Sequence, residues 1–193
     1  MKWVVRTVVA GVVLASVWVS PASASASTAT AERSAGLGQL TELVVQRIEV
    51  GDLVAASKFG TDKPIDDPAR EKVVLDQARA SAIQLGIDPE ETVTFLHDQI
   101  EASKVVQRGL FARWTAHPEQ APTTRPDLNE IRLKLDHLTT ELLQELRSTT
   151  SVRHTGIRCA VDLTASSIVS GIQHNLDHLH AKALTGAVAD VCS

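Results

Sequence analysis

The chain has 193 residues, with 19 basic and 23 acidic side chains and a net charge of −4 at pH 7. This acidic balance disfavours nucleic acid as a partner, because binding to the phosphate backbone needs a surplus of lysine and arginine. The length is that of one domain able to bury its own core without help from metals or many disulfides.

The first residues have the pattern of an export signal. Lys2 and Arg6 precede an apolar run over residues 8–19, and small residues that suit signal peptidase follow it. The run is too short to cross a bilayer comfortably, although a retained membrane anchor is the alternative. We therefore predict a signal peptide over residues 1–26, a disordered Ser/Thr/Ala-rich leader over 27–35 and a folded domain over 36–193. The mature protein is expected in the periplasm or the medium, without membrane contact.

Two cysteines, Cys159 and Cys192, are present in the whole chain. In an oxidising compartment such a pair is expected to form a disulfide, and two free thiols are the alternative. By the loop-entropy model, closing a loop of this size stabilises the fold by about 3–4 kcal/mol, less any strain.

Beyond the leader, apolar residues recur at helical spacing, and strand-like alternation is hard to find. The first helix carries its stripe from Leu40 to Lys58 and is expected to stop at Gly60. The second is expected to begin at the acidic cap and proline of residues 66–68 and to end at Gly86.

Two further helix starts are clear in the sequence. Asp88 precedes a proline and a capping-box glutamate, which predicts a third helix to about residue 116. Three prolines over 117–126 predict a connecting loop, after which Asp127 opens a fourth helix to about residue 147. One or two more helices are expected from about Ile157. The predicted fold is all-α, a single-domain bundle of about five to six helices with one C-terminal disulfide.

Several polar residues lie where the helical period calls for apolar ones. They are Arg47 and Lys58 in the first helix, Asp67, Arg70 and Glu71 at the start of the second, Ser103 and Gln107 in the third, and Arg132 in the fourth. Each alone is best explained as an interhelical salt bridge or a side chain that snorkels to the surface. Together, three arginines and a lysine with few acids leave a surplus of positive charge. A small dianion held between the helices would neutralise it.

The ordered set from Arg47 and Lys58 through Asp67-Pro68-Ala69-Arg70-Glu71 to Ser103 and Gln107 resembles the all-helical chorismate mutases. It is closer still to their secreted bacterial subclass, which has a signal peptide, an arginine at the position of Arg132 and a C-terminal disulfide. The resemblance covers the chain from about residue 40 to 192. It implies chorismate as the small-molecule substrate, an active site complete within one chain, and a homodimer.

Carried over residue by residue, the resemblance implies that Arg47, Arg70 and Arg132 bind the two substrate carboxylates. Lys58 and Gln107 would contact the ether oxygen of the breaking bond.

The remaining polar positions have roles implied in the same way. Glu71, with Asp67 beside it, would take the ring hydroxyl, and Ser103 would add a hydrogen bond near a carboxylate. The rearrangement is one concerted step within one molecule, so no cofactor, metal or nucleophile is expected.

Two alternatives to the mutase interpretation stay open. One is a secreted, non-catalytic helical binding or effector protein that kept the bundle and lost the reaction. The other is a metal site, because His174 and His178 stand one turn apart with Asp177 and His180 nearby, a spacing that can hold zinc. We favour a solvated helix face for these histidines.

Overall fold

The computed structural model describes residues 36–192, and within that range the chain forms helices and no strand. The predicted signal peptide and leader lie outside the described residues. The helices are α2 (Gly38–Lys58), α3 (Pro68–Leu85), α4 (Pro89–Ala116), α5 (Leu128–Ser148), α6 (Thr150–Arg153), α7 (Ile157–Gln173) and α8 (His178–Ala187), with a 3₁₀ turn at Pro118–Gln120. The predicted all-α bundle is confirmed: six of these helices have ten residues or more, and α6 is a single turn.

The expected helix ends are where the sequence chemistry places them. The side chain of Asp67 accepts from the backbone N–H of Arg70 at the start of α3, and Asp88 caps α4 through two backbone N–H groups. Gly86 ends α3 in the left-handed conformation, with φ of 72°. The first helix ends at Lys58, two residues before Gly60, whose positive φ turns the chain towards α3.

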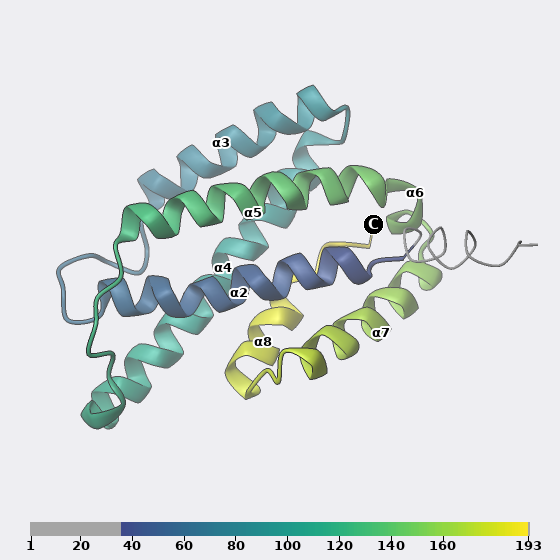
Figure 1. Cartoon of the computed structure of the whole chain (residues 1–193). Helices are drawn as coiled ribbons and strands as arrows, with labels where there is room; N and C mark the ends of the chain where they lie inside the picture. Colours follow the sequence, from purple (N-terminus) through teal and green to yellow (C-terminus); the bar gives the residue numbers. More distant parts are fainter. Residues whose placement is uncertain (1–35, 193) are drawn as a thin grey trace, which may run out of the picture.

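Helix α2 is the centre of the bundle, and it packs against α4, α5, α7 and α8 (Figure 1). Its buried side chains include Leu40, Val44 and Ile48, which meet the long helix α4 through Leu96 and Val106 in one continuous apolar core. Helix α4 also packs against α3 and α8, so it joins the two sides of the molecule. The positions of α2 and α4 therefore determine how the other helices pack around them.

One short element was not expected. The next helix was expected only from about Ile157, but the Ser/Thr segment after α5 already contains α6. The hydroxyl groups of Thr149 and Thr150 donate to carbonyl oxygens in the last turn of α5, and this satisfies groups that a helix end leaves free. Arg153, which is buried, then lies 3.6 Å from Glu91 of α4 and anchors the extra turn.

The C-terminal part is attached to the rest of the bundle covalently. Cys159, in the first turn of α7, forms a disulfide with Cys192 after α8, as predicted. No helix among residues 36–192 is both long enough and apolar enough to span a bilayer.

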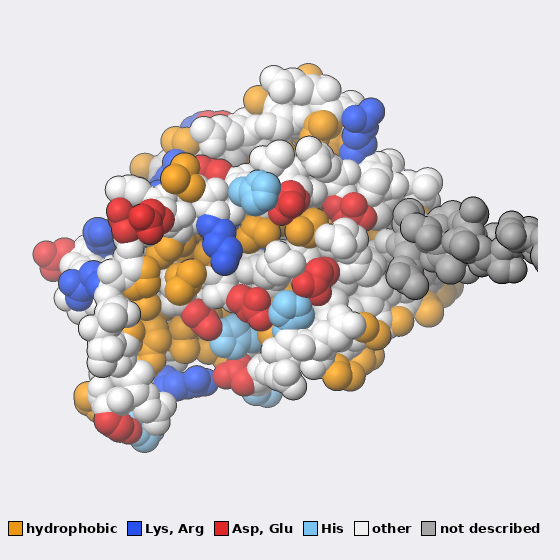
Figure 2. Space-filling view, in the orientation of Figure 1, with side chains coloured by type: hydrophobic (Ala, Val, Ile, Leu, Met, Phe, Trp, Pro, Cys, Tyr) orange, Lys and Arg blue, Asp and Glu red, His pale blue; other side chains and the backbone are white. Residues whose placement is uncertain are grey.

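Two histidines of the C-terminal segment are bound by acids of α2, not solvated as expected. His174 meets Glu42 and Glu49 at 2.9 and 2.8 Å, and its side chain is 22% exposed. Hydrogen bonds to these two glutamates raise the pKa of His174 against the effect of burial. Figure 2 shows the resulting band of histidine and acidic side chains across the front of α2.

A second histidine, His180, makes a similar contact with an acidic residue further along α2. His180 lies 2.9 Å from Asp52 and 2.6 Å from Asp177, and it is 12% exposed. The hydrogen bond to Asp52 is the main reason that its pKa rises to about 9. Within the described range no group of three His, Cys, Asp or Glu side chains has the arrangement of a metal site. The histidines therefore join α7 and α8 to α2 electrostatically.

Candidate functional site

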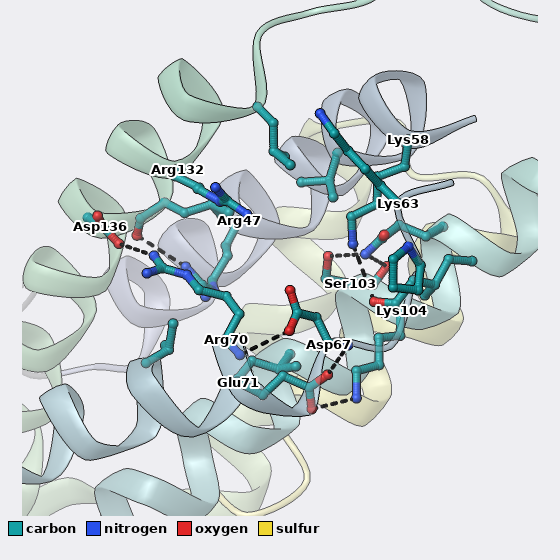
Figure 3. Close-up of a pocket in the computed structure, with 18 of the residues that line it drawn as sticks. Arg47, Lys58, Lys63, Asp67, Arg70, Glu71, Ser103, Lys104, Arg132 and Asp136 are labelled. Carbon is teal, nitrogen blue, oxygen red and sulfur yellow. Dashed lines mark hydrogen bonds and ion pairs between the residues drawn. The ribbon is translucent and has the colours of Figure 1, made fainter. Parts of the chain in front are cut away.

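A cleft of about 330 Å³ lies among α2, α3, α4 and α5 (Figure 3). All eight side chains that the sequence analysis singled out line it: Arg47, Lys58, Asp67, Arg70, Glu71, Ser103, Gln107 and Arg132. They come from four different helices, so the fold brings together residues that are up to 85 positions apart in the sequence. The volume suits one small organic ligand.

Arg47 is the most deeply buried cation of the cleft, with 6% of its surface exposed. One of its terminal nitrogens donates to the carbonyl oxygen of Leu135 and to the hydroxyl of Thr139, at 3.2 and 3.1 Å. Its Nε is buried without a hydrogen-bond partner. Burial lowers the pKa of Arg47 to about 10, against the attraction of nearby Asp136, so the guanidinium stays charged at neutral pH. A buried cation with an unused donor is poised to meet an anion.

Lys58 is at the last position of α2 and points into the cleft (Figure 3). Its Nζ has one hydrogen bond, to the carbonyl oxygen of Ile65 at 3.3 Å. Burial lowers its pKa, Asp67 opposes this effect, and the positive charge of Arg132 adds to it. An ammonium group has three donors, so Lys58 keeps donors for a ligand.

The first turn of α3 contributes Asp67, Arg70 and Glu71. The backbone N–H of Asp67 donates to a carboxylate oxygen of Glu71 at 3.1 Å, while the Asp67 side chain accepts from the N–H of Arg70 at 3.0 Å. These reciprocal bonds fix the turn. The guanidinium of Arg70 then reaches across to α5, where it lies 3.7 Å from Asp136.

Gln107 of α4 is almost fully buried, with 3% of its surface exposed. Its amide nitrogen donates to the hydroxyl and the carbonyl oxygen of Ser103, one turn earlier, at 3.1 and 3.2 Å. Its amide oxygen is buried without a partner. Ser103 therefore orients the amide within the cleft.

Arg132 of α5 completes the set of arginines. It is partly exposed, and its contact with the side chain of Asn129 is long, at 3.4 Å. Figure 3 shows the guanidinium groups of Arg47, Arg70 and Arg132 on one side of the cleft, and Lys58 on the other side near Ser103. The two ends of a bound ligand would thus meet different groups.

The balance of charge in the cleft is positive. Six lysines and arginines line it against four acids, so the lining carries a net charge of +2. A dianionic ligand would neutralise this surplus.

Sequence reasoning did not select four charged residues of the lining, namely Lys63, Lys104, Asp127 and Asp136, and it named Asp127 only as a helix cap. The helical period could have found two of them. Lys104 comes three positions before Gln107, and Asp136 comes four after Arg132, so each shares a face with a residue that was selected. Lys63 is in the loop between α2 and α3, where no period applies.

The fold and the cleft together define an all-helical protein with a positively charged cleft of the size of a small organic ligand. Comparisons with known proteins extend this result. A family model described as chorismate mutase type II matches residues 38–108. The secreted chorismate mutase of Mycolicibacterium smegmatis is 33% identical over 164 residues, which are 85% of this chain and 90% of that protein. That of Mycobacterium tuberculosis is 32% identical over 163 residues, 83% of this chain and 81% of that protein.

Solved structures agree with these sequence matches. The crystal structure of chorismate mutase from Burkholderia thailandensis has a TM-score of 0.77 and 34% identity, covering 81% of this chain and 98% of that one. The chain belongs to the chorismate mutase family, and its relatives include secreted members. The resemblance to chorismate mutases stated from the sequence is thereby confirmed. The comparisons do not favour the alternative of a non-catalytic binding protein.

Proposed function

We propose that this chain catalyses the rearrangement of chorismate to prephenate in the cleft between α2, α3, α4 and α5. The observation that carries the proposal is that one cleft of about 330 Å³ holds three arginines, Lys58 and Gln107, with a net charge of +2 around it. Chorismate is a compact dianion with two carboxylates, a ring hydroxyl and an ether oxygen. Each of these groups has a matching side chain in the cleft.

The arginines are proposed to bind the two carboxylates. A guanidinium can meet a carboxylate with two parallel hydrogen bonds, so it fixes orientation as well as charge. Arg47 is held by Leu135 and Thr139 and has little freedom. Among residues 36–192, the side chains of Arg70 and Arg132 have only long contacts, of 3.7 and 3.4 Å. We infer that Arg47 is preorganised, and that the other two close on the ligand.

Lys58 and Gln107 are proposed to meet the ether oxygen, where negative charge grows as the C–O bond breaks. The ammonium has donors to spare, and the amide nitrogen of Gln107, held by Ser103, would exchange one of its two bonds to that residue for the ether oxygen. Donors fixed in this way stabilise the transition state more than the ground state. No proton needs to be transferred, because the bonds rearrange within one molecule.

Glu71 is proposed to accept from the ring hydroxyl, with Asp67 supporting it through their shared capping bonds. Each carboxylate oxygen of Glu71 already accepts one hydrogen bond, from the backbone N–H of Asp67 and from Lys104. A carboxylate has about four lone-pair sites, so a further bond from the ligand is compatible with this arrangement. Ser103 is proposed to contribute near a carboxylate.

The experiment is to follow prephenate formation by the purified, unreduced protein without added metal, beside an Arg47→Met variant. Met keeps much of the length of the side chain and removes the charge. The proposal predicts turnover by the wild type and a KM at least about tenfold higher in the variant, because a charge-assisted bond to substrate is lost. A variant with unchanged KM would contradict the role given to Arg47.

We also propose that residues 1–26 direct export and are removed, that residues 27–35 form a leader, and that 36–193 are the catalytic domain of a periplasmic or released protein. The names of the mycobacterial relatives support export. The N-terminal residue of the protein recovered from the exported fraction tests the cleavage site. A mature chain that still begins at residue 1 would contradict it.

A homodimer with one complete site per chain is proposed as well. The outer face of α7 supports it, because Ile157, Val161 and Ile172 expose 85%, 65% and 71% of their surface. Exposed apolar patches of this kind mark interfaces. Light scattering on the eluted protein measures the mass directly, and a monomer at all concentrations would contradict the proposal.

A further inference from the structure

We propose that Lys104 is a positioning residue of this active site, which holds Glu71 and thereby fixes the first turn of α3, with Arg70, against the cleft. The inference rests on the proposed function and names a residue that the family resemblance did not supply.

Lys104 is buried to a degree that is rare for lysine, with 7% of its surface exposed. Its Nζ lies 2.7 Å from a carboxylate oxygen of Glu101, 2.8 Å from one of Glu71 and 3.6 Å from one of Asp66. Burial alone would favour the neutral amine, but the hydrogen bonds to Glu101 and Glu71 raise its pKa. The group is therefore a permanent cation in the wall of the cleft.

The contacts distinguish Lys104 from Lys58, the half-buried lysine of the cleft. Lys104 donates hydrogen bonds to Glu101 and Glu71 and lies 3.6 Å from Asp66, so its charge is already shared among three carboxylates. Lys58 uses one donor, on a carbonyl oxygen at 3.3 Å. Of the two, Lys58 is suited to touch the substrate and Lys104 is suited to hold other residues.

Glu71, which Lys104 holds, begins a series of hydrogen bonds that leads to Arg70. One oxygen of Glu71 accepts from Lys104, and the other accepts from the backbone N–H of Asp67 at 3.1 Å. The side chain of Asp67 in turn accepts from the N–H of Arg70 at 3.0 Å. Figure 3 shows this sequence of dashed bonds along the lower wall of the cleft. Lys104 thus joins α4 to the turn that aims Arg70.

Without the cation, Glu71 and Glu101 would face each other across α3 and α4 with no charge between them, and Asp66 would add to the repulsion. Asp66 has its own partner in Arg108, at 2.6 Å, so it does not depend on Lys104 alone. Like charges in a partly buried site repel strongly enough to move a helix end. The first turn of α3 would shift away from α4, and Arg70 and Glu71 would move with it.

The test compares Lys104→Met with Lys72→Met. Lys72 is also paired with one carboxylate, that of Asp76 at 2.6 Å, but it is exposed on the outside of α3. We expect kcat/KM of Lys104→Met to fall by about 10- to 100-fold, the usual effect of moving a binding group by about 1 Å, with most of the loss in KM. Lys72→Met should match the wild type, and Lys104→Arg should recover most of the loss.

The division between KM and kcat separates positioning from simple destabilisation. A variant that is only partly folded has fewer active molecules, which lowers the apparent kcat and leaves KM unchanged. If Lys104→Met does not fold, the double variant Glu101→Gln/Lys104→Met removes one of the unpaired charges, and it should show the same rise in KM.

Three results would overturn the inference: an unchanged KM in Lys104→Met, the same loss in Lys72→Met, or no recovery in Lys104→Arg. Each of them leaves the proposed function standing, provided that the wild type converts chorismate. A folded wild type without turnover would instead overturn the proposed function, and the role of Lys104 with it.

Discussion

Replacing Gln107 by glutamate should turn a pH-independent enzyme into one that loses activity as pH rises. In the wild type the amide nitrogen donates whatever the pH, so we expect turnover to be flat from about pH 5 to 8. A carboxyl group at the same position can donate to the ether oxygen only when it is protonated. The change keeps the size of the side chain and alters little but this donor.

The magnitude follows from the burial of the site. With 3% of Gln107 exposed, a carboxyl there is desolvated, and desolvation raises the pKa of a carboxyl group above its ordinary range. Above that pKa the protonated fraction falls about tenfold for each pH unit. Between about pH 6 and 8 we therefore expect kcat/KM of Gln107→Glu to fall by up to about a hundredfold, while the wild type changes little.

The assay is the initial rate of chorismate loss at a series of pH values, at constant ionic strength, for wild type, Gln107→Glu and Gln107→Leu. The leucine variant has no donor and should be slow at every pH, about 10²–10³-fold below wild type in kcat, as for other lost transition-state donors. A flat profile for Gln107→Glu at wild-type rates would refute the reasoning, because the side chain would then not be acting as a donor.

Three further outcomes are expected. Asp136→Asn should lower KM by about two- to fivefold in steady-state kinetics. The exposed ion pair between Asp136 and Arg70 competes with substrate, and such pairs are worth about 0.2–1 kcal/mol. A raised KM would show that Asp136 helps binding. Replacing Cys159 and Cys192 together by alanine should reduce the free energy of unfolding by about 3–4 kcal/mol in urea, given the 33-residue separation, whereas an unchanged midpoint would show that the bridge adds nothing. His180 has a folded pKa raised to about 9, so its stabilising effect is complete below its unfolded pKa of about 6.5 and is lost as pH rises through about 9. The unfolding temperature of the wild type should therefore fall as pH rises through that window, and that of His180→Gln should fall much less. Parallel plots of unfolding temperature against pH for the two proteins would contradict this role of His180.

The sequence predicted the helix starts and ends because they depend on local chemistry. An acidic side chain before a proline at Asp67 and Asp88, and a glycine at Gly86, act within one turn of the chain, whatever the rest of the fold does. The single turn of α6 was missed because it depends on a distant contact, between Arg153 and Glu91 of α4.

The cleft was predicted as a set of residues, but its electrostatic structure was not. Polar residues on apolar stripes pointed to Arg47, Lys58 and Gln107, because a period of 3.6 places them towards the core. The partners of those residues lie on other helices, and their distances could not be deduced from spacing. The position of Asp136 between Arg47 and Arg70 is of this kind.

The histidines of α7 and α8 show the same limit. Their spacing suggested either a metal or a solvated face, since a sequence does not show which helix packs opposite. The structure places Glu42, Glu49 and Asp52 of α2 against His174 and His180, which is a third arrangement.

The most direct test of the account is the rate of chorismate loss with purified wild type and with Lys58→Ala, unreduced and without added metal. The account predicts turnover by the wild type and a transition-state loss of about 2.7–4 kcal/mol in the variant, because one preorganised donor at the ether oxygen is gone. A folded Lys58→Ala protein that keeps near-full turnover would contradict the mechanism proposed for this cleft.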